Sequence, residues 1–287
     1  RQRQMCIRDS DNIVIAGKKR VKVLSEADPS KLPWEKLNID VVLECSGRFT
    51  KYEDAYKHIT AGARHVVISA PGKGDMKTIV YGVNDSILDG SEEVISAASC
   101  TTNCLAPVLD VIEKNIGIRK GYMSTVHAYT NDQATLDIHH SKGIMARRGR
   151  ACAQNIVPAS TGAASAIGKV IPSLLGKMDG MAFRVPVSCG SVVDLTLELD
   201  KNVSKEELND LLRNNQSEAL KVCEDPIVSS DVLGKKCGAL VDLLSTNVLE
   251  TESGNLVKVV AWYDNEMGYS MQTVSYTHLT LPTTPYV

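Results

Sequence analysis

The sequence predicts an α/β domain followed by an α+β domain. Segments that look like strands and helices alternate in the N-terminal part of the chain, which is typical of a parallel sheet. After Cys100, several strand-like segments follow one another without a helix between them, which favours a mixed or antiparallel sheet. The 287 residues are enough for two ordinary hydrophobic cores. We therefore place a domain boundary near Cys100.

Short apolar runs rich in β-branched residues mark the strands of the first domain. Residues 39–45 (IDVVLEC) and 65–69 (HVVIS) predict two buried strands, and residues 51–62 predict a helix between them. Two further strands are expected at residues 78–83 and 93–97.

The second domain is expected to begin with a helix, because residues 100–114 carry Leu, Val and Ile at helical spacing. Pro107 inside this segment is an objection to that prediction. Residues 131–150 predict a long polar loop, and loops of this length are usually functional or disordered. The remaining expected elements are strands at 122–130, 182–186, 192–199, 239–243 and 256–262, and helices at 160–171 and 204–214.

Composition excludes several classes of function. Lys and Arg total 32 against 34 Asp and Glu, and this balance argues against a nucleic-acid-binding protein. No stretch approaches the roughly 20 apolar residues of a membrane-spanning helix, and the polar N-terminal residues do not form a secretory signal. The eight cysteines show no spacing suited to zinc, so we expect no metal and free thiols in the cytoplasm.

The two ends of the chain differ from the rest. Residues 1–10 show no periodicity, and residues 275–287 are rich in Thr and Pro. We expect both to be tails that are disordered or foreign to the protein.

Cys100 is the strongest candidate for a catalytic residue. A cysteine at a helix N-terminus faces unpaired backbone N–H groups and the positive end of the helix dipole, and both favour the reactive thiolate. His127 ends a predicted strand one helix and one turn later, so the topology allows the imidazole to reach the thiol. Spacing alone leaves open the alternative of a buried cysteine and an unrelated core histidine.

A set of ordered motifs gives these residues a context. The chain resembles the phosphorylating glyceraldehyde-3-phosphate dehydrogenases from about residue 11 to residue 274. The motifs are AASCTTNC (97–104), TVHAYTNDQ (125–133), NIVPASTGAA (155–164), MAFRVP (181–186), SVVDLT (191–196) and WYDNEMGYS (262–270).

The resemblance implies a domain plan. Residues 11–99 and 265–274 would form part of an NAD-binding Rossmann domain, and residues 100–264 would form the catalytic domain. No glycine-rich dinucleotide fingerprint follows a strand, and the acidic residue that contacts the ribose is missing. The chain is therefore expected to begin after the first strand, helix and second strand of a truncated Rossmann domain.

The resemblance also implies a reaction. Cys100 would attack the aldehyde of glyceraldehyde-3-phosphate, a hydride would pass to NAD, and inorganic phosphate would cleave the resulting thioester. His127 would act as acid and base. The substrate-phosphate site would use Thr130 and Arg184, and the inorganic-phosphate site Ser99, Thr101, Thr161 and Gly162.

For the cofactor, Asn265 would hold the nicotinamide amide, with Tyr269 beside it. Ser46 and Gly47 would form a turn near the adenosine and pyrophosphate, at the carboxyl edge of the predicted sheet. Phe49 would flank the adenine and Ser69 would approach the nicotinamide. NAD is expected, and NADP stays open because the discriminating acidic position is missing.

The sequence also leads to expectations about the oligomeric state and about alternative functions. The resemblance implies a homotetramer in which residues 137–150 contact a neighbouring subunit, with Arg147, Arg148 and Arg150 as contact candidates or as solvated loop charges. Alternatives are an erythrose-4-phosphate dehydrogenase, a Cys/His hydrolase or acyltransferase without a nicotinamide, and a catalytically silent fragment.

Overall fold

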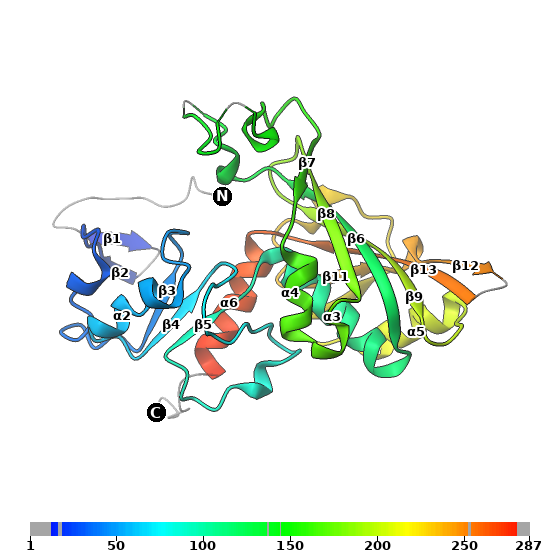
Figure 1. The fold of residues 1–287 in the computed structure, drawn as a ribbon, viewed down its shortest axis with the longest axis horizontal. Coiled ribbons are helices and arrows are strands. Elements are labelled where there is room, and N and C mark those ends of the chain that lie inside the picture. The colour runs from blue at the N-terminus through cyan, green and yellow to red at the C-terminus, as the bar shows by residue number, and fades with distance from the viewer. Residues whose placement is uncertain (1–12, 17–18, 137, 144, 252–253, 280–287) are drawn as a thin grey trace.

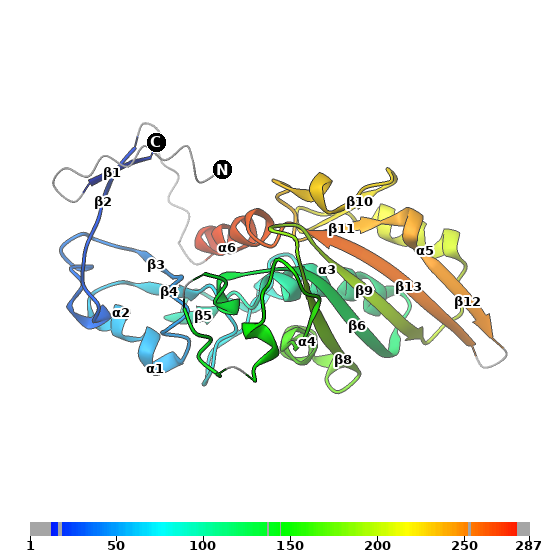
Figure 2. The ribbon, with the colours of Figure 1, turned by 90° about the horizontal axis from the view of Figure 1, so that it is seen from above.

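The fold consists of a small parallel sheet, a large mixed sheet and the helix α6 between them (Figure 1). The computed structural model describes residues 13–16, 19–136, 138–143, 145–251 and 254–279. Within these residues, no helix is long and apolar enough to cross a membrane. Figure 2 shows the two sheets at opposite ends of the molecule, with α6 again between them.

The small sheet has the parallel topology that the sequence predicts. Its strands are β3 (Val41–Glu44), β4 (His65–Ile68) and β5 (Val94–Ser96), in that spatial order and all parallel. The helices α1 (Tyr52–Ala55) and α2 (Lys57–Thr60) lie between β3 and β4 in the chain. A separate antiparallel hairpin of β1 (Ile13–Ala16) and β2 (Lys19–Lys22) precedes them.

Two predictions for this region are wrong in detail. The single helix expected at 51–62 is two short helices that meet at Tyr56, which keeps helical dihedrals and the backbone bonds to Tyr52 and Thr60. The strand expected at 78–83 is a single bridge from Thr78 to Ser96. The chain turns at once because the side chain of Asn84 bonds the backbone N–H of Val80 and the carbonyl of Thr78.

The large sheet has eight strands and is mixed, as expected. Their path is β10-β11-β13-β9-β6-β8-β7, with β12 on β13; β10/β11 and β6/β8 are parallel and the other pairs antiparallel. The strands are β6 (Ile118–Ala128), β7 (Val157–Ser160), β8 (Met178–Val185), β9 (Ser191–Leu199), β10 (Leu220–Cys223), β11 (Ala239–Asp242), β12 (Asn247–Thr251) and β13 (Gly254–Tyr263). The sequence did not predict β7, β10 and β12; β7 contains Pro158, which an edge strand tolerates.

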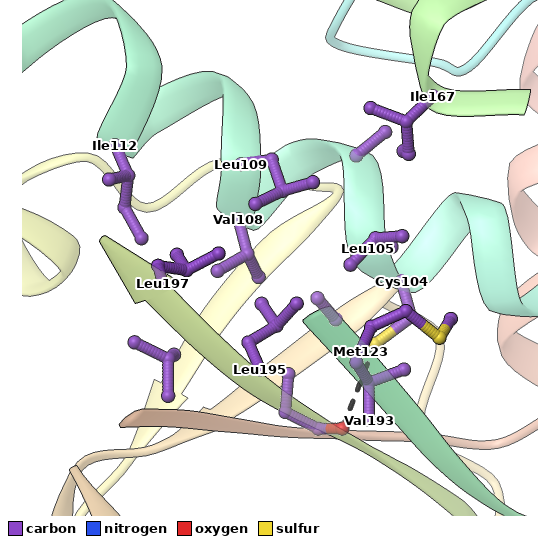
Figure 3. Close-up of a cluster of buried hydrophobic side chains, with 14 of the residues drawn as sticks. Cys104, Leu105, Val108, Leu109, Ile112, Met123, Ile167, Val193, Leu195 and Leu197 are labelled. Atoms are coloured by element: carbon purple, nitrogen blue, oxygen red, sulfur yellow. Dashed lines mark hydrogen bonds between the residues drawn. The ribbon is translucent and has the colours of Figure 1, made fainter. Parts of the chain in front are cut away.

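Helix α3 (Cys100–Asn115) anchors the main hydrophobic core against the large sheet. Its Leu105, Val108 and Leu109 lie against β6 and β9 residues such as Met123 and Leu195 (Figure 3). The helix forms as predicted, with Pro107 inside it. Helices α4 (Ala163–Val170) and α5 (Lys205–Asn214) contribute to the same core.

Helix α6 (Met267–Leu279) returns the chain to the small sheet. Tyr276 is fully buried, and its hydroxyl is hydrogen-bonded to the N–H of Tyr81 and to the side chain of Asn103. The tail expected from residue 275 is therefore part of an ordered helix as far as Leu279, because a buried tyrosine anchors it. Residues 1–10 and 280–287, the rest of the expected tails, lie outside the described residues.

Candidate active site

Cys100 is the first residue of α3 and follows a strained turn. Ala98 is buried and has a φ of 57°, a conformation that costs a non-glycine residue energy. Its carbonyl accepts a hydrogen bond from the Tyr269 hydroxyl at 3.1 Å. Ser99 caps the helix, since its Oγ accepts the N–H of Thr102 at 3.1 Å. The turn and the cap together fix the place where the thiol emerges.

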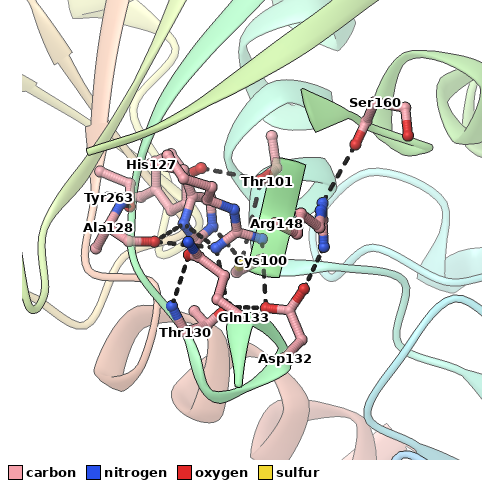
Figure 4. A network of polar contacts seen from close by, with 12 residues as sticks. Cys100, Thr101, His127, Ala128, Thr130, Asp132, Gln133, Arg148, Ser160 and Tyr263 are labelled. Carbon is pink, nitrogen blue, oxygen red and sulfur yellow. Dashed lines mark hydrogen bonds and ion pairs between the residues drawn. The ribbon is translucent and has the colours of Figure 1, made fainter. Parts of the chain in front are cut away.

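His127 contacts the thiol from the end of β6. Its Nε2 lies 3.4 Å from Cys100 Sγ, a contact that the predicted topology allowed (Figure 4). Its Nδ1 lies 2.7 Å from the carbonyl oxygen of Ala128. With the ring proton on Nδ1 bonded to that carbonyl, Nε2 is free to accept the thiol proton.

Arg184 lies beside His127 because β8 pairs with β6 in register, so that the two residues are direct neighbours. Its Nη1 lies 2.9 Å from His127 Nδ1, 2.9 Å from the Ala128 oxygen and 3.0 Å from Thr130 Oγ1. Its buried Nε has no hydrogen-bond partner among the described residues. A cation in this setting favours an anionic ligand.

The electrostatics favour an uncharged Cys–His pair at rest. Burial raises the pKa of the Cys100 thiol, although Thr101 and Arg184 act in the opposite direction. Burial and then the Arg184 charge lower the pKa of His127 to about 4. Burial therefore favours the neutral thiol over the thiolate expected from the helix N-terminus, because removing ions from water opposes the stabilisation that the helix and the arginine provide.

Tyr263 fixes the floor of the site. Its buried hydroxyl lies 2.9 Å from Thr101 Oγ1 and 2.8 Å from Thr125 Oγ1. Its ring meets the imidazole of His127 edge to face at 5.9 Å. The Thr101 hydroxyl, predicted to bind phosphate, thus shares a hydrogen bond with a buried tyrosine, and it can still donate to an anion when Tyr263 is the donor in that bond.

Asp132 and Arg148 were not predicted as site residues. Asp132 accepts hydrogen bonds from Thr130 Oγ1 and Arg148 Nη1, and one of its oxygens lies 3.9 Å from Arg184 Nη2. Arg148 also donates to the carbonyl of Ser160 at 3.2 Å (Figure 4). Arg148 thus reaches into the site from the loop that was expected to contact another subunit. The sequence held one indication of this role, because Asp132 follows the predicted phosphate-binding residue Thr130 by two positions.

A second helix N-terminus also faces the site. Gly162 is the N-cap of α4, and Thr161 Oγ1 accepts the N–H of Ala163 at 3.2 Å. Thr161 and Gly162, which were predicted to hold inorganic phosphate, thus lie at the start of this helix. The starts of α3 and α4 border the same cavity, and helix starts favour anions.

One cavity of about 460 Å³ brings most of the predicted residues together. It combines the thiol, the imidazole, the two arginines and both helix starts. Its lining includes these predicted residues: Ser69, Ser99, Cys100, Thr101, His127, Thr130, Thr161, Gly162, Arg184, Asn265 and Tyr269.

Asn265 presents an amide group to this cavity. Its Oδ1 accepts hydrogen bonds from Gly190 N–H at 3.2 Å and Ser191 Oγ at 3.0 Å. Among the described residues, none accepts a hydrogen bond from its Nδ2. An oriented amide donor of this kind fits the carboxamide oxygen of a nicotinamide.

Ser46, Gly47 and Phe49 lie outside the lining of this cavity. Ser46 is hydrogen-bonded to Glu44, and the Phe49 ring lies edge to face with His58 at 6.4 Å. The structure thus groups the predicted reacting and phosphate residues, and it places these predicted cofactor contacts apart from them, after β3.

A parallel strand–helix–strand unit beside a Cys–His pair and two arginines fits the class of enzymes that use a thiol nucleophile on an anionic substrate. Residues 99–265 match the family described as "Glyceraldehyde 3-phosphate dehydrogenase, C-terminal domain". Residues 2–52 match the companion family described as "Glyceraldehyde 3-phosphate dehydrogenase, NAD binding domain".

Curated relatives carry the same name. A glyceraldehyde-3-phosphate dehydrogenase of Clostridium pasteurianum is 55% identical over 260 residues, which is 91% of this chain and 78% of the relative. One of Clostridium acetobutylicum has the same identity and coverage, and one of Streptococcus pyogenes is 53% identical over 255 residues, 88% of this chain and 76% of the relative. The chain belongs to the glyceraldehyde-3-phosphate dehydrogenase family, and the predicted combination of Rossmann and catalytic domains is confirmed.

Proposed function

We propose that the protein oxidises glyceraldehyde-3-phosphate with NAD and inorganic phosphate to an acyl phosphate, with Cys100 as nucleophile. The family membership supports the reaction and the cofactor. The contact of 3.4 Å between Cys100 Sγ and His127 Nε2 is the observation that carries the assignment of roles.

The attack begins with proton transfer. His127 takes the thiol proton on Nε2 while Cys100 Sγ bonds to the aldehyde carbon, and the resulting imidazolium is held by the Ala128 carbonyl at Nδ1. The imidazolium then gives this proton to the aldehyde oxygen, which leaves a hemithioacetal and a neutral His127. Backbone N–H groups at the start of α3 stabilise the developing oxyanion.

Oxidation follows at the same carbon. NAD supplies the chemistry of this step, because it accepts the hydride when bound. His127 removes the proton of the hemithioacetal hydroxyl, and Cys100 then carries a thioester. Asn265 would hold the nicotinamide amide through Nδ2, since its Oδ1 is bonded to Gly190 and Ser191. Tyr269, which lines the cavity, would lie beside it.

Phosphorolysis completes the reaction. An oxygen of inorganic phosphate attacks the thioester carbon, and the Cys100 sulfur leaves as a thiolate and regains the proton from His127. Ser99, the backbone at Thr101, and the start of α4 at Thr161 and Gly162 hold this phosphate. Thr130 and Arg184 hold the phosphate of the substrate.

The substrate phosphate also tunes the base. Arg184 lies against His127 Nδ1 and contributes to its lowered pKa. A phosphate bound to Arg184 offsets that positive charge, so the pKa of His127 rises toward the working pH when the substrate is in place. The thiol is therefore activated in the complex and protected from side reactions in the free enzyme.

NADH formation at neutral pH tests this proposal. The protein with glyceraldehyde-3-phosphate, NAD and phosphate should form NADH continuously, whereas without phosphate it should stop after about one turnover. Activity with erythrose-4-phosphate that exceeds activity with glyceraldehyde-3-phosphate would overturn the substrate assignment. Thioester hydrolysis without NAD would point to the hydrolase alternative instead.

The finer assignments concern assembly and compartment. We infer a homotetramer in which residues 137–150 contact a neighbour, supported by the exposure of Leu136 (77%), Ile138 (64%) and Met145 (91%) in and beside this loop. Light scattering of the purified protein tests it. The described cysteines are all free, which supports a reducing compartment such as the cytoplasm.

A further inference from the structure

A series of buried hydrogen bonds in the small domain ends at the turn after β3. Trp34 Nε1 donates to His58 Nδ1 at 3.0 Å, and His58 Nε2 lies 3.1 Å from Glu44 Oε2. Both His58 and Glu44 are almost fully buried, at 4% and 6% exposure. No step of the proposed reaction uses these groups.

The first bond of this hydrogen-bond chain fixes all the others. An indole N–H can only donate, so His58 Nδ1 is an acceptor and Nε2 carries the ring proton. That proton can only point at Glu44, whose carboxylate is therefore an acceptor. The other oxygen, Oε1, accepts both the backbone N–H of Ser46 at 2.7 Å and its hydroxyl at 2.5 Å. Burial alone would raise the pKa of Glu44, but these hydrogen bonds lower it.

The turn that Glu44 holds lies at the carboxyl edge of the parallel sheet, where open α/β sheets bind ligands. The backbone carbonyl of Glu44 accepts the N–H of Ser69 at 3.0 Å, and Ser69 lines the cavity that contains Cys100. Arg48 N–H is bonded to Ser46 Oγ at 3.1 Å, so the turn is closed on its inner side. Gly47 has a φ of 71°, and no described atom lies within 4 Å of where its Cβ would stand. Its outer side is therefore open to a ligand.

We propose that Glu44 is a positioning residue for NAD, which acts through the Ser46–Gly47 turn and is itself fixed by His58 and Trp34. This inference rests on the proposed function, because it assumes that NAD binds along this edge. Burying an ionised carboxylate costs free energy unless hydrogen bonds replace those it made to water. Here both carboxylate oxygens accept hydrogen bonds, Oε1 from the turn and Oε2 from His58, the histidine that orients the carboxylate.

Glu44→Gln tests the chain with minimal change of shape. The amide must place an N–H group against Ser46 or against His58 Nε2–H. If His58 changes tautomer to accept that group, its Nδ1–H then meets the Trp34 N–H. A donor–donor conflict therefore arises somewhere along the chain whichever way the amide turns.

The experiment is calorimetric titration of the whole protein with NAD, together with ¹⁵N NMR of its histidine rings. Glu44→Gln should weaken NAD binding about tenfold. Trp34→Phe, a milder change at a half-buried site far from the turn, should weaken it about threefold and make the His58 tautomers mixed. Glu53→Gln, an exposed neutralisation on α1, is the matched control and should leave the affinity and the His58 signals unchanged.

The outcomes separate this inference from the proposed function. If the wild-type protein does not bind NAD, both are overturned for this chain. If it binds NAD and Glu44→Gln binds equally well, only the positioning role is overturned, even if the variant is less stable. A wild-type His58 whose Nδ1 carries the proton would also overturn it, because the chain of donors would then not exist.

Discussion

The two ends of the catalytic cleft are built differently. On the Cys100 side, the reacting groups come from α3 and from the long neighbouring strands β6 and β8 of an eight-stranded sheet with one extended core. On the small-sheet side, strands of three or four residues carry two smaller clusters, and ligand contacts depend on turns. The proposed reacting groups thus lie where strand register fixes side chains to each other, while the proposed NAD contacts at Ser46 and Gly47 lie on a backbone turn that buried polar groups hold.

The largest loss of activity is expected when the nucleophile is removed. Cys100→Ser should lower phosphate-dependent NADH formation on the order of 10⁴-fold, because a hydroxyl with an uncharged imidazole is a far weaker nucleophile. NAD affinity, measured by titration, should change little. Cys223→Ser removes a thiol distant from the cavity and should retain full activity. Substantial turnover by the Cys100 variant would contradict the assigned role.

The two cores should differ in their response to the same truncation. Ile112→Ala in α3 should cost about 4 kcal/mol of unfolding free energy, and Ile68→Ala in β4 about 2 kcal/mol, because the smaller cluster can close around the gap. Urea unfolding, followed by fluorescence of the two tryptophans, measures both changes. Equal costs would show that the two regions are packed alike.

Lowering the pH should reduce the free energy of unfolding through protonation of His127. Its pKa is about 4 when folded against 6.5 for the free side chain, so between these values the unfolded chain binds more protons. The unfolding free energy should therefore fall by about 3 kcal/mol through this group as the pH drops from 6.5 to 4. His127→Gln should lose this part of the pH dependence in urea titrations at several pH values. If the pH dependence of stability is the same in the variant, the pKa of His127 is not lowered in the folded protein.

Two glycine substitutions should distinguish backbone strain from loss of a contact with NAD. Gly47→Ala and Gly90→Ala both place a Cβ in open space at a positive φ, and each should cost about 1 kcal/mol of stability. Only Gly47→Ala lies at the proposed cofactor edge, so it alone should weaken NAD binding. Equal NAD affinities in the two variants would remove Gly47 from the site.

The sequence predicted the catalytic half of the site better than the rest, for a physical reason. Cys100 and His127 are placed by a helix start and a strand end, features that periodicity and caps reveal. The effect of burial on their pKa values was not foreseen, since burial depends on tertiary packing that the local pattern does not contain.

Tertiary contacts explain the other differences. Arg148 is held at the cavity by Asp132 and by the carbonyl of Ser160, contacts that bridge a long loop. Tyr276 looked like part of a tail, and its burial depends on Tyr81 and Asn103, which are distant in the sequence. The strand expected at 78–83 failed because the Asn84 side chain turns the chain back on itself, which hydrophobic patterning does not reveal.

The central claim is that Cys100 carries the acyl group in a thioester. Incubation with glyceraldehyde-3-phosphate and NAD in the absence of phosphate, followed by acid quenching and mass spectrometry of the peptides, tests it directly. The account predicts one phosphoglyceroyl group per chain, on Cys100, which disappears when phosphate is added before the quench. Acylation of Cys104 or another cysteine, or NADH formation without any acylated peptide, would contradict it.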